Sequence, residues 1–514
     1  MTYVTPQISR RGMLKAAGAV GAGATATTTA TVLGTAPATA AGTAPAHPGL
    51  LHTRADLDRM AAKVRAGAAP HTAGFAKLAA NRHSAAGWTA DPQATVYRGS
   101  GTPENYSLLY NDIHAAYQNA LRGHVSGDSA HLDTAVAILN AWSARLTKLD
   151  GSADRFLAAG LYGYQFANAA ELVRDHGDFD LGRFQSMLST VFAPLSDSFL
   201  VDHNGAVVTN YWPNWDLTAV ACVLATGIFC DDTAQIARAV DYFKNGEGMG
   251  SVRHAIPVVR DDGLAEWVEA GRDQGHALLG VGLMGTVCEM AWNQGIDLYG
   301  HDDSRFLKGA QYVAKWSMGG DVAYTANTRA KGAIGGWSGQ ETATDAAAVD
   351  PAMRRPVWAM IANHYTKRRG MSATHLTRIA AQAAPEGGGG DYGPNSGGYD
   401  QLGFGTLAFT RDRAVDTSAP PSRAAGASAS SAPGTGAGSG TATDSGAGSG
   451  ARPQTGGTAA PSPSPSAGNR GRGDLAATGA DDIVGWTAAA GITAVAGGLL
   501  FLRRRDRVRR DAAQ

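Results

Sequence analysis

The sequence predicts an all-α fold for residues 47–413, and two observations support that prediction. Apolar residues recur at positions i, i+3, i+4 and i+7 in ten or more segments, which is the spacing of amphipathic helices. The links between these segments are short and often carry Gly, Asp or Asn, which start and end helices. Helices joined in this way form a helical bundle, a solenoid or an (α/α) toroid, and periodicity alone does not choose among these.

Five helices are predicted in the first half of this block. Leu57, Met60 and Ala61 share one face of the first helix. Gly123 ends the second helix, and a Gly-Asp-Ser turn at 127–129 precedes the third. The predicted ranges are 55–65, 113–121, 132–142, 158–172 and 181–195.

Five more helices are predicted in the second half, where a Cys-Asp-Asp-Thr turn at 230–233 separates the first two. Their ranges are 217–229, 233–243, 274–293, 303–317 and 357–367. Strand patterns are weak until the Gly-rich segment 386–398 has passed. The closing stretch 399–410 is then predicted to be a short strand or a last packed turn.

The composition narrows the possible function classes. The 44 Lys and Arg residues balance 44 Asp and Glu residues, and a neutral chain argues against non-specific nucleic-acid binding. Only 3 cysteines are present, which excludes a disulfide scaffold and a four-Cys zinc cluster. Neither a His-Glu-x-x-His motif nor a phosphate-binding Gly loop with Lys occurs. We therefore expect no nucleic-acid partner, no metal and no cofactor.

The N-terminus is typical of a secretory signal of the twin-arginine type. Arg10 and Arg11 precede an apolar, Ala- and Gly-rich run at 16–33, and small residues at 38–40 fit a signal-peptidase site. We predict that residues 1–40 are an export signal. The twin-arginine translocase would then be a partner, and the protein would fold before export.

The C-terminus resembles a sortase cell-wall sorting signal. Residues 475–479 read Leu-Ala-Ala-Thr-Gly, and an apolar stretch at 484–502 and a basic tail follow. By this resemblance, residues 475–514 form the sorting signal, and sortase cuts between Thr478 and Gly479 to join the chain to peptidoglycan. The alternative is a single transmembrane anchor, and both interpretations place the protein at the cell surface.

A spacer is predicted between the helical block and this signal. Residues 416–473 consist mainly of Ser, Gly, Ala, Pro and Thr, with almost no large apolar side chain. Such a segment cannot bury enough surface to offset the entropy of ordering. We therefore expect a disordered linker.

The segment 209–217 reads Thr-Asn-Tyr-Trp-Pro-Asn-Trp-Asp-Leu and carries a first group of candidate site residues. Pro213 must break any preceding helix, so the next helix starts nearby. Asn amides donate to carboxylates and hydroxyls, and exposed aromatic rings stack on sugar faces. The alternative is a buried aromatic corner in which Asn caps a helix. The candidates are Asn210, Tyr211, Trp212 and Trp215 for substrate binding and Asn214 for catalysis.

A second group lies in the segment 266–276, where Arg272 and His276 are four residues apart. In a helix these two side chains share a face and Gln274 turns away, whereas in a loop that enters a helix all three can converge. Arg offers a planar fork to a carboxylate, and His has a pKa suited to proton removal near neutral pH. The alternative is a structural Arg–Asp–His cluster at a helix start.

Together these segments resemble the alginate-lyase-type polysaccharide lyases, which have an (α/α) toroid. Further matching pieces are the opening at 52–57, Asn-Ala-Ala-Glu-Leu at 168–172, Gln-Gly-Ile-Asp-Leu-Tyr at 294–299 and the closing stretch 399–410. The resemblance covers most of residues 47–410. It implies that the block is a catalytic domain with this toroid fold, and we expect it to be a monomer.

The resemblance also implies β-elimination of an acidic, uronate-containing polysaccharide. Asn214, with Arg272, would neutralise the uronate carboxylate while His276 removes the C5 proton or stabilises charge, and Gln274 would contact substrate. A tyrosine is expected to protonate the leaving oxygen. One branch of these enzymes has an Asn-His pair where this sequence has Asn-Tyr and Asn-Trp, so alginate itself is not implied. The candidate tyrosines are Tyr365 as first choice, with Tyr211 and Tyr299 as alternatives.

Two other functions remain open from the sequence. A glycoside hydrolase on the same toroid would need two carboxylates that face the scissile bond, and Glu266, Glu269 and Asp273 are the nearest candidates. A non-catalytic surface protein would bind glycan through Trp212 and Trp215.

Overall fold

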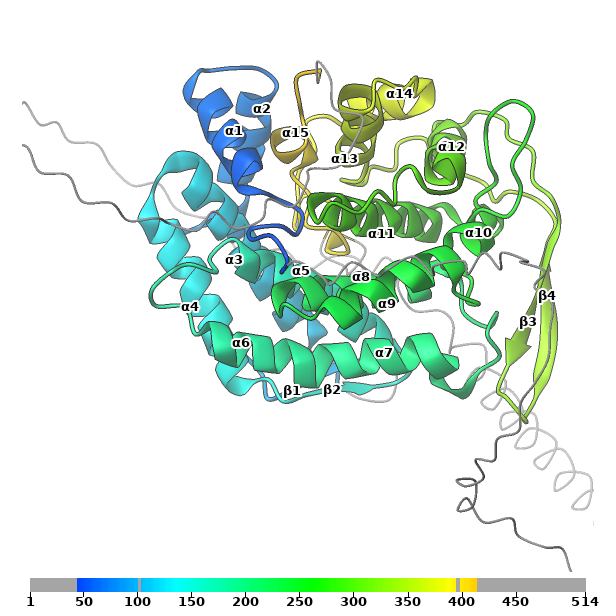
Figure 1. The fold of residues 1–514 in the computed structure, drawn as a ribbon, viewed down its shortest axis with the longest axis horizontal. Coiled ribbons are helices and arrows are strands. Elements are labelled where there is room, and N and C mark those ends of the chain that lie inside the picture. Colours follow the sequence, from blue (N-terminus) through cyan, green and yellow to red (C-terminus); the bar gives the residue numbers. More distant parts are fainter. Residues whose placement is uncertain (1–43, 100–102, 394–397, 414–514) are drawn as a thin grey trace, which may run out of the picture. The chain divides into compact units, whose positions relative to one another are not determined.

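Helices dominate the computed structural model, which describes residues 44–99, 103–393 and 398–413 (Figure 1). Most of them alternate along the chain between two roles, an inner and an outer one. The inner helices are α3 (Tyr106–Ser126), α5 (Asp154–Glu171), α8 (Pro213–Phe229), α11 (Gln274–Asn293) and α13 (Trp358–Asn363). The outer helices are α4 (Ser129–Arg145), α6 (Leu181–Met187) with α7 (Ala193–Asp202), α9 (Thr233–Asn245), α12 (His301–Ser317) and α14 (Thr374–Ala383).

Burial separates the two roles. Every residue of α8 and α11 is buried, and so is almost every residue of α5, whereas α4, α9 and α12 bury one side only. A helix that is apolar all round lies in the interior, and an amphipathic helix lies at the surface. The inner helices pack in chain order, α3 on α5, α5 on α8, α8 on α11 and α11 on α13. This arrangement of helical hairpins is consistent with an (α/α) toroid.

The inner helices all begin at the same end of the ring. Strand β1 (Thr95–Arg98), which precedes α3, pairs in parallel with β2 (Lys148–Gly151), which precedes α5. Helices α5 and α8 pack so closely that only glycine fits at position 160. A Cβ added to Gly160 would lie 2.5 Å from Oγ1 of Thr218. A Cβ on Gly163 would likewise lie 2.4 Å from Sγ of Cys222, so the two helices run parallel and in register. We call the end where the inner helices begin the mouth, and the opposite end the base.

Residues 46–52 cover the base by crossing the C-terminal ends of α5 and α11. The backbone N–H of Gly49 donates to Glu171 of α5 at 2.9 Å, and the His47 ring lies 2.6 Å from the same carboxylate. The side chain of Asn293, the last residue of α11, donates to the Leu50 carbonyl at 2.7 Å. These bonds join the segment to side chains at the last residues of the two helices.

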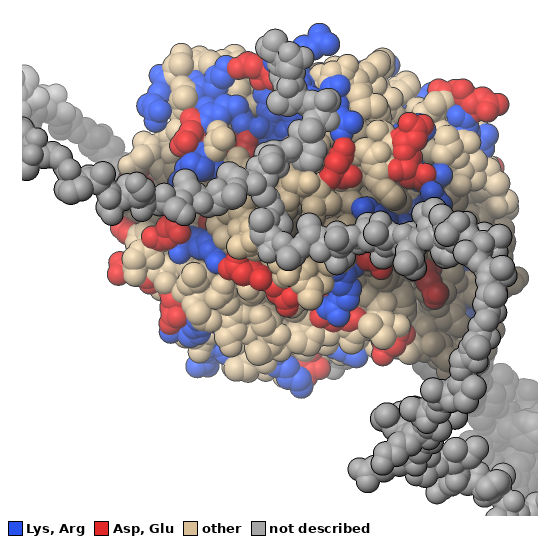
Figure 2. Space-filling view, viewed as in Figure 1, with Lys and Arg blue, Asp and Glu red and all other residues tan. Residues whose placement is uncertain are grey.

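Charged side chains also join the two ends of the described chain at the base. Arg59 of α1 (Arg54–Arg65) and Arg411 both pair with the buried Asp56, and Arg411 lies 3.6 Å from Glu289 of α11. Basic side chains gather over α1 and α2 (His71–Ala80) and over α15 (Gly405–Ala408) in Figure 2. The ring is therefore closed by contacts between residues more than 350 positions apart in sequence, Asp56 and Arg411.

A β-hairpin lies at one edge of the ring, on the right in Figure 1. Strands β3 (Asn327–Gly332) and β4 (Ser338–Ala343) are antiparallel, and Ile334 and Trp337 in the turn between them are exposed. The hairpin docks on the loop before α8, where the Val207 N–H donates to the Gly332 carbonyl at 2.9 Å. The sequence did not predict this hairpin, because its strands lack a continuous apolar alternation.

All ten predicted helices are present. Their bounds differ most at α3, which begins seven residues before the predicted 113–121, and at α7, which ends seven residues after the predicted 195. The ranges 181–195 and 357–367 each contain a π-helical turn. The stretch 399–410 contains the four-residue helix α15 (Gly405–Ala408) and no strand, so the packed turn is correct there and the strand is wrong. Helices α2, α14 and the four-residue α10 (Val252–Ala255) were not predicted. No helix among the described residues is long and apolar enough to cross a bilayer. The predicted export signal, spacer and sorting signal, including Thr478 and Gly479, lie outside the described residues.

Candidate active site

The candidate active site lies at the mouth, where the inner helices present their N-termini. Asn214 is the second residue of α8 and His276 the third residue of α11. Pro213 occupies the first turn of α8, which therefore begins four residues before the predicted start at 217, and Asp273 caps α11. Helix N-termini carry unpaired N–H groups and a partial positive charge, so this end of the ring favours an anionic ligand.

Asp273 orients the His276 ring. The Asp273 carboxylate accepts a hydrogen bond from the His276 backbone at 2.8 Å and lies 2.7 Å from Nδ1 of the ring. Burial lowers the pKa of His276 below its ordinary value, although Asp273 opposes this shift. A neutral ring that donates from Nδ1 to Asp273 keeps its lone pair on Nε2, and this buried nitrogen has no partner among the described residues. His276 is therefore arranged as a base.

Glu269 connects the start of α8 to Arg272. Its carboxylate accepts a hydrogen bond from the Asn214 backbone N–H and, at 3.0 Å, one from Nη1 of Arg272. The side chain is completely buried, and burial raises the pKa of Glu269 to about 7 despite the nearby arginine. Arg272 also lies 3.6 Å from Asp273, so one chain of contacts runs from Asn214 to His276.

The Asn214 side chain is the least satisfied group of the mouth. It is 1% exposed, and neither its oxygen nor its nitrogen has a hydrogen-bond partner in the described part of the chain. An unpaired buried amide costs about 1–3 kcal/mol, so such groups are rare unless a ligand completes them. The amide can donate to a carboxylate, which is the role that the sequence assigned to it.

Two arginines flank Trp212 beside this amide. The guanidinium of Arg329, from β3, lies 4.4 Å from the Trp212 ring centre, and that of Arg272 lies 5.9 Å from it. Arg329 also binds the carbonyl of Asn210 and the carboxylate of Glu341. Burial lowers the pKa of Arg329, and the charge of Arg272 adds to this shift. Arg272 and Arg329 are 57 residues apart in sequence, and together they concentrate positive charge beside Trp212.

A second basic group extends the mouth towards α3 and α5. Arg355 is 6% exposed and, among the described residues, its side chain makes no hydrogen bond; its charge lowers the pKa of His276. Burial raises the pKa of Asp400 to about 6, against the opposing charges of Arg355 and Arg98. Arg98 donates to the hydroxyl of Tyr162 at 3.1 Å. The sequence analysis missed Arg98, Arg329 and Arg355, because no local pattern distinguishes them from surface arginines.

The predicted substrate-binding residues of the segment 209–217 are placed at the mouth but are mostly buried. Trp215 is 2% exposed, and its ring centre lies 4.6 Å from that of Tyr211. The Tyr211 hydroxyl accepts a hydrogen bond from the Asn204 amide. Trp212 is 4% exposed, so neither tryptophan offers an open stacking surface. Asn210 holds the hairpin by accepting from the Gly332 N–H at 2.8 Å. This geometry does not favour the glycan-binding surface protein that depended on exposed tryptophans.

Gln274 anchors a loop. Its side chain accepts from the Asp350 N–H at 2.8 Å and donates to the Asp350 carbonyl at 3.1 Å. Arg272 precedes the helix and His276 lies inside it, which is the second of the two geometries considered from the sequence. In that arrangement Arg272 and His276 converge through Asp273, while Gln274 is occupied elsewhere.

The structure does not bring Tyr365 to the mouth. Its ring is 1% exposed, its hydroxyl donates to the Tyr299 carbonyl at 3.0 Å, and it packs near Cys288. Cys288 lies twelve residues beyond His276 on α11, which is about 18 Å along a helix. Tyr299 is equally buried, and its hydroxyl donates to Glu289 at 3.2 Å. Both tyrosines belong to the base.

The carboxylates considered for a hydrolase all have other partners. Glu266 accepts from the backbone N–H and the hydroxyl of Thr325, at 2.6 and 2.9 Å, and pairs with Arg260. Glu269 is held by Arg272, and Asp273 by His276. This arrangement does not favour a pair of carboxylates that flank a scissile bond. Among the described residues, no group of three or more His, Cys, Asp or Glu side chains is placed to hold a metal ion.

Comparison with known proteins identifies one family. The family model described as alginate lyase matches residues 60–322, just over half of the chain, and this range includes both Asn214 and His276. No curated protein matches the sequence.

Solved structures of alginate lyases are also similar, though distantly. The apo form of a His-to-Ala variant of alginate lyase A1-III is 13% identical, covers 70% of this chain and 95% of its own, and has a TM-score of 0.46. Alginate lyase A1-III from Sphingomonas species A1 is 14% identical over 50% of this chain and 76% of its own, with a TM-score of 0.38. An alginate lyase from Bacteroides ovatus is 13% identical over 53% and 83%, with a TM-score of 0.37.

Proposed function

From the premise that this chain belongs to the alginate lyase family and is a polysaccharide lyase, we propose that it cleaves a uronate-containing polysaccharide by β-elimination. The observation that carries this proposal is the pairing of two unpartnered buried groups, the Asn214 amide and Nε2 of His276, within one chain of contacts. A uronate supplies what each group lacks, since it has a carboxylate next to a weakly acidic C5–H bond.

Each residue has a defined part in the proposed reaction. The Asn214 amide and the Arg272 guanidinium bind the uronate carboxylate and stabilise the charge that develops there. Nε2 of His276 accepts the C5 proton, the C5–H electron pair forms the C4–C5 double bond, and the C4–O4 bond breaks. The leaving O4 takes one proton. Tyr299 and Tyr365 lie at the base, and the Tyr211 ring is buried against Phe199 and Trp215. We therefore route this proton through the His276 imidazolium, which receives the C5 proton and returns it to O4.

The test is a cleavage assay with the purified full-length chain. It should be incubated with a panel of uronic-acid polysaccharides while the ultraviolet absorbance of an unsaturated uronate is followed. Absorbance that rises with the wild type and not with His276→Ala supports the proposal. New reducing ends without absorbance would instead support hydrolysis, and no cleavage of any uronate polymer would refute the proposal.

The pH dependence of the rate gives a second test. The base is active only when His276 is neutral, and burial places its pKa below the ordinary value of about 6.5. We expect kcat/KM to rise with pH through an acid limb below 6.5 and then to level off near neutrality. A limb centred above pH 7 would contradict His276 as the base.

We also propose that the protein is exported by the twin-arginine translocase as a monomer and is anchored to the cell wall by sortase. This rests on the sequence of residues 1–40 and 475–514. Lysine at both Arg10 and Arg11 should hold the protein inside the cell. A Thr478→Ala variant should move it from the wall fraction to the membrane fraction, whereas an unchanged distribution would favour the single transmembrane anchor.

A further inference from the structure

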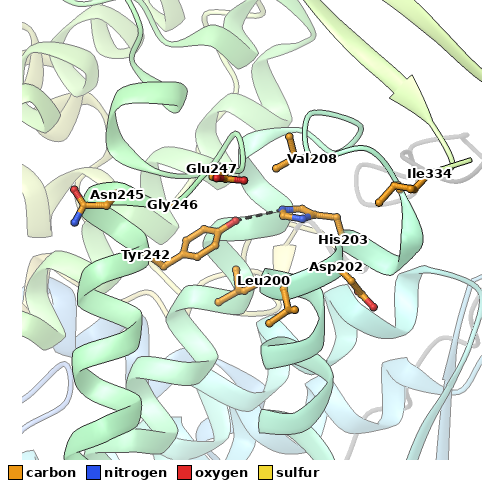
Figure 3. Close-up of a pocket in the computed structure, with 11 residues that line it drawn as sticks. Leu200, Asp202, His203, Val208, Tyr242, Asn245, Gly246, Glu247 and Ile334 are labelled. Carbon is orange, nitrogen blue, oxygen red and sulfur yellow. Dashed lines mark hydrogen bonds between the residues drawn. The ribbon is translucent and has the colours of Figure 1, made fainter. Parts of the chain in front are cut away.

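A cavity of about 420 Å³ lies on the outer side of α8, between the C-terminal ends of α7 and α9 (Figure 3). Leu200, Val208 and Ile334 line it with apolar side chains, and Ile334 reaches it from the turn of the β3–β4 hairpin. The Ile334 N–H donates to the Gly205 carbonyl at 2.9 Å, which fixes the hairpin over the opening. A volume of this size lies within the range of small-molecule sites, about 300–1,000 Å³.

The polar wall of this cavity is held in place by buried hydrogen bonds. Nε2 of His203 lies 3.0 Å from Asp216 and 3.2 Å from the Tyr242 hydroxyl, which points towards it in Figure 3. The Asp216 carboxylate also accepts from the Gly250 N–H at 2.7 Å. A Cβ on Gly248 would lie 2.3 Å from both the Tyr242 hydroxyl and Asp216, so only glycine fits against this cluster. The wall is therefore formed before any ligand binds.

The charge of the cavity is opposite to that of the mouth. Asp202 and Glu247 line it, and neither Lys nor Arg is among the described residues that do so. The Asn245 amide nitrogen donates to Asp241 at 2.8 Å, which leaves its oxygen to accept from a ligand. Carboxylate and amide oxygens accept hydrogen bonds from hydroxyl groups but repel another carboxylate. The cavity is thus suited to a ligand with many hydroxyl groups and no negative charge.

We propose that this cavity binds a neutral hexopyranose unit, at a site separate from the catalytic mouth. The ring C–H face of the sugar packs on the apolar wall and the Tyr242 ring, and the hydroxyls donate to Glu247, Asp202 and Asn245. The cavity shares no lining residue with the mouth. The β3–β4 hairpin nevertheless contributes to both sites. Ile334, in the hairpin turn, lines the cavity, and the guanidinium of Arg329, in β3, packs on the Trp212 ring at the mouth.

Calorimetry on the full-length His276→Ala variant tests the proposal without cleavage. The probes are neutral disaccharides (cellobiose, maltose and lactose), a glucosamine disaccharide and a uronate disaccharide. We expect saturable binding of at least one neutral disaccharide and at least tenfold weaker binding after Val208→Trp, which fills the cavity. Val259→Trp is the matched control, because Val259 is an exposed valine outside the cavity, and it should leave affinity unchanged.

A second variant guards against misfolding of Val208→Trp. Asn245 is exposed, and Asn245→Ala removes one accepting oxygen, which should weaken binding about two- to tenfold. The proposal is overturned if no neutral disaccharide binds, or if affinity is the same in Val208→Trp, Asn245→Ala and the control. It is also overturned if the glucosamine or the uronate disaccharide binds more tightly than every neutral one. All these readouts are independent of lyase activity, so failure of the lyase proposal would not affect them.

Discussion

The mouth and the base of the ring both bury polar side chains, but they pair them differently. At the base, Glu289 accepts 2.7 and 2.8 Å hydrogen bonds from the two terminal nitrogens of Arg368 and a 3.2 Å bond from Tyr299. At the mouth, the Asn214 amide and Nε2 of His276 have no partner among the described residues. Buried atoms without a hydrogen-bond partner among the described residues also occur at the base, such as Nδ1 of His52 and Nε2 of His364. The difference is that the base is held by the two-bond ion pair of Glu289 and Arg368, whereas the mouth carries an amide and an imidazole that we propose bind substrate.

The contacts that stabilise the fold and the groups proposed to act on substrate therefore lie at opposite ends of the ring. Contacts at the base join residues that are far apart in sequence, so they hold the ring closed. The unpaired groups at the mouth lower stability by about 1–3 kcal/mol each, which a protein tolerates where a ligand replaces the missing partner. Substitutions at the base should therefore change the free energy of unfolding, and substitutions at the mouth should change the rate.

The largest expected effect is on the rate, and it compares His276→Ala with Tyr365→Phe. Removing the base at the mouth should lower kcat by about 10²–10⁴-fold with little change in the melting temperature. Tyr365→Phe removes one buried hydrogen bond at the base, so it should cost about 1 kcal/mol of stability and leave kcat unchanged. Steady-state kinetics and thermal unfolding of both variants check this. A large loss of kcat in Tyr365→Phe would restore Tyr365 as a catalytic residue.

The next effect is on stability at the base. Glu289→Ala leaves Arg368 buried without its partner, which should lower the free energy of unfolding by about 3–5 kcal/mol. Urea unfolding followed by circular dichroism measures this loss. Lys308→Ala is a suitable control, because its ion pair with the exposed Asp303 should contribute less than about 1 kcal/mol. Equal losses in the two variants would contradict the structural role of the base.

The success of the sequence analysis differed between the two ends. Helical periodicity located the inner helices, and Pro213 marked a helix break close to the start of α8, because these signals act over a few residues. Asn214 and His276 were singled out by the chemistry of their side chains and by the family resemblance. Arg329 and Arg355 reach the mouth from segments without such signals, so only the folded chain shows them. Tyr365 was assigned to the site on family resemblance, and its depth along the ring cannot be read from local sequence.

A smaller effect concerns pH and Glu269 at the mouth. Burial raises its pKa to about 7, so between about pH 4.5 and 7 the folded state binds more protons than the unfolded state. Its contribution to stability is thus fully present below pH 4.5 and is lost as pH rises through 7. We expect Glu269→Gln to remove this dependence and to raise KM through misplacement of Arg272. Unfolding curves from pH 5 to 8 for wild type and variant test this, and parallel curves would refute it.

The smallest effect should come from His47 at the base. Burial lowers its pKa, but the hydrogen bonds and charges of Glu171 and Asp231 outweigh this, so the pKa is raised overall. Its stabilisation is fully present below about pH 6.5 and is lost as pH rises through the folded-state pKa. Because the ring is partly exposed, His47→Gln should cost about 1 kcal/mol or less, and only in acid. A larger loss at pH 9 than at pH 5 would contradict this assignment.

The sealed base also determines how the molecule responds to force. Ala46 is bonded to Gln294 and Arg411 lies against Glu289, so the first and last described segments both meet the C-terminal end of α11. A pulling force applied at either end of the described chain therefore acts first on these contacts at the base. It does not act directly on the residues at the mouth. A molecule held by one end of the described chain therefore keeps the candidate groups Asn214 and His276 on the side away from the point of attachment.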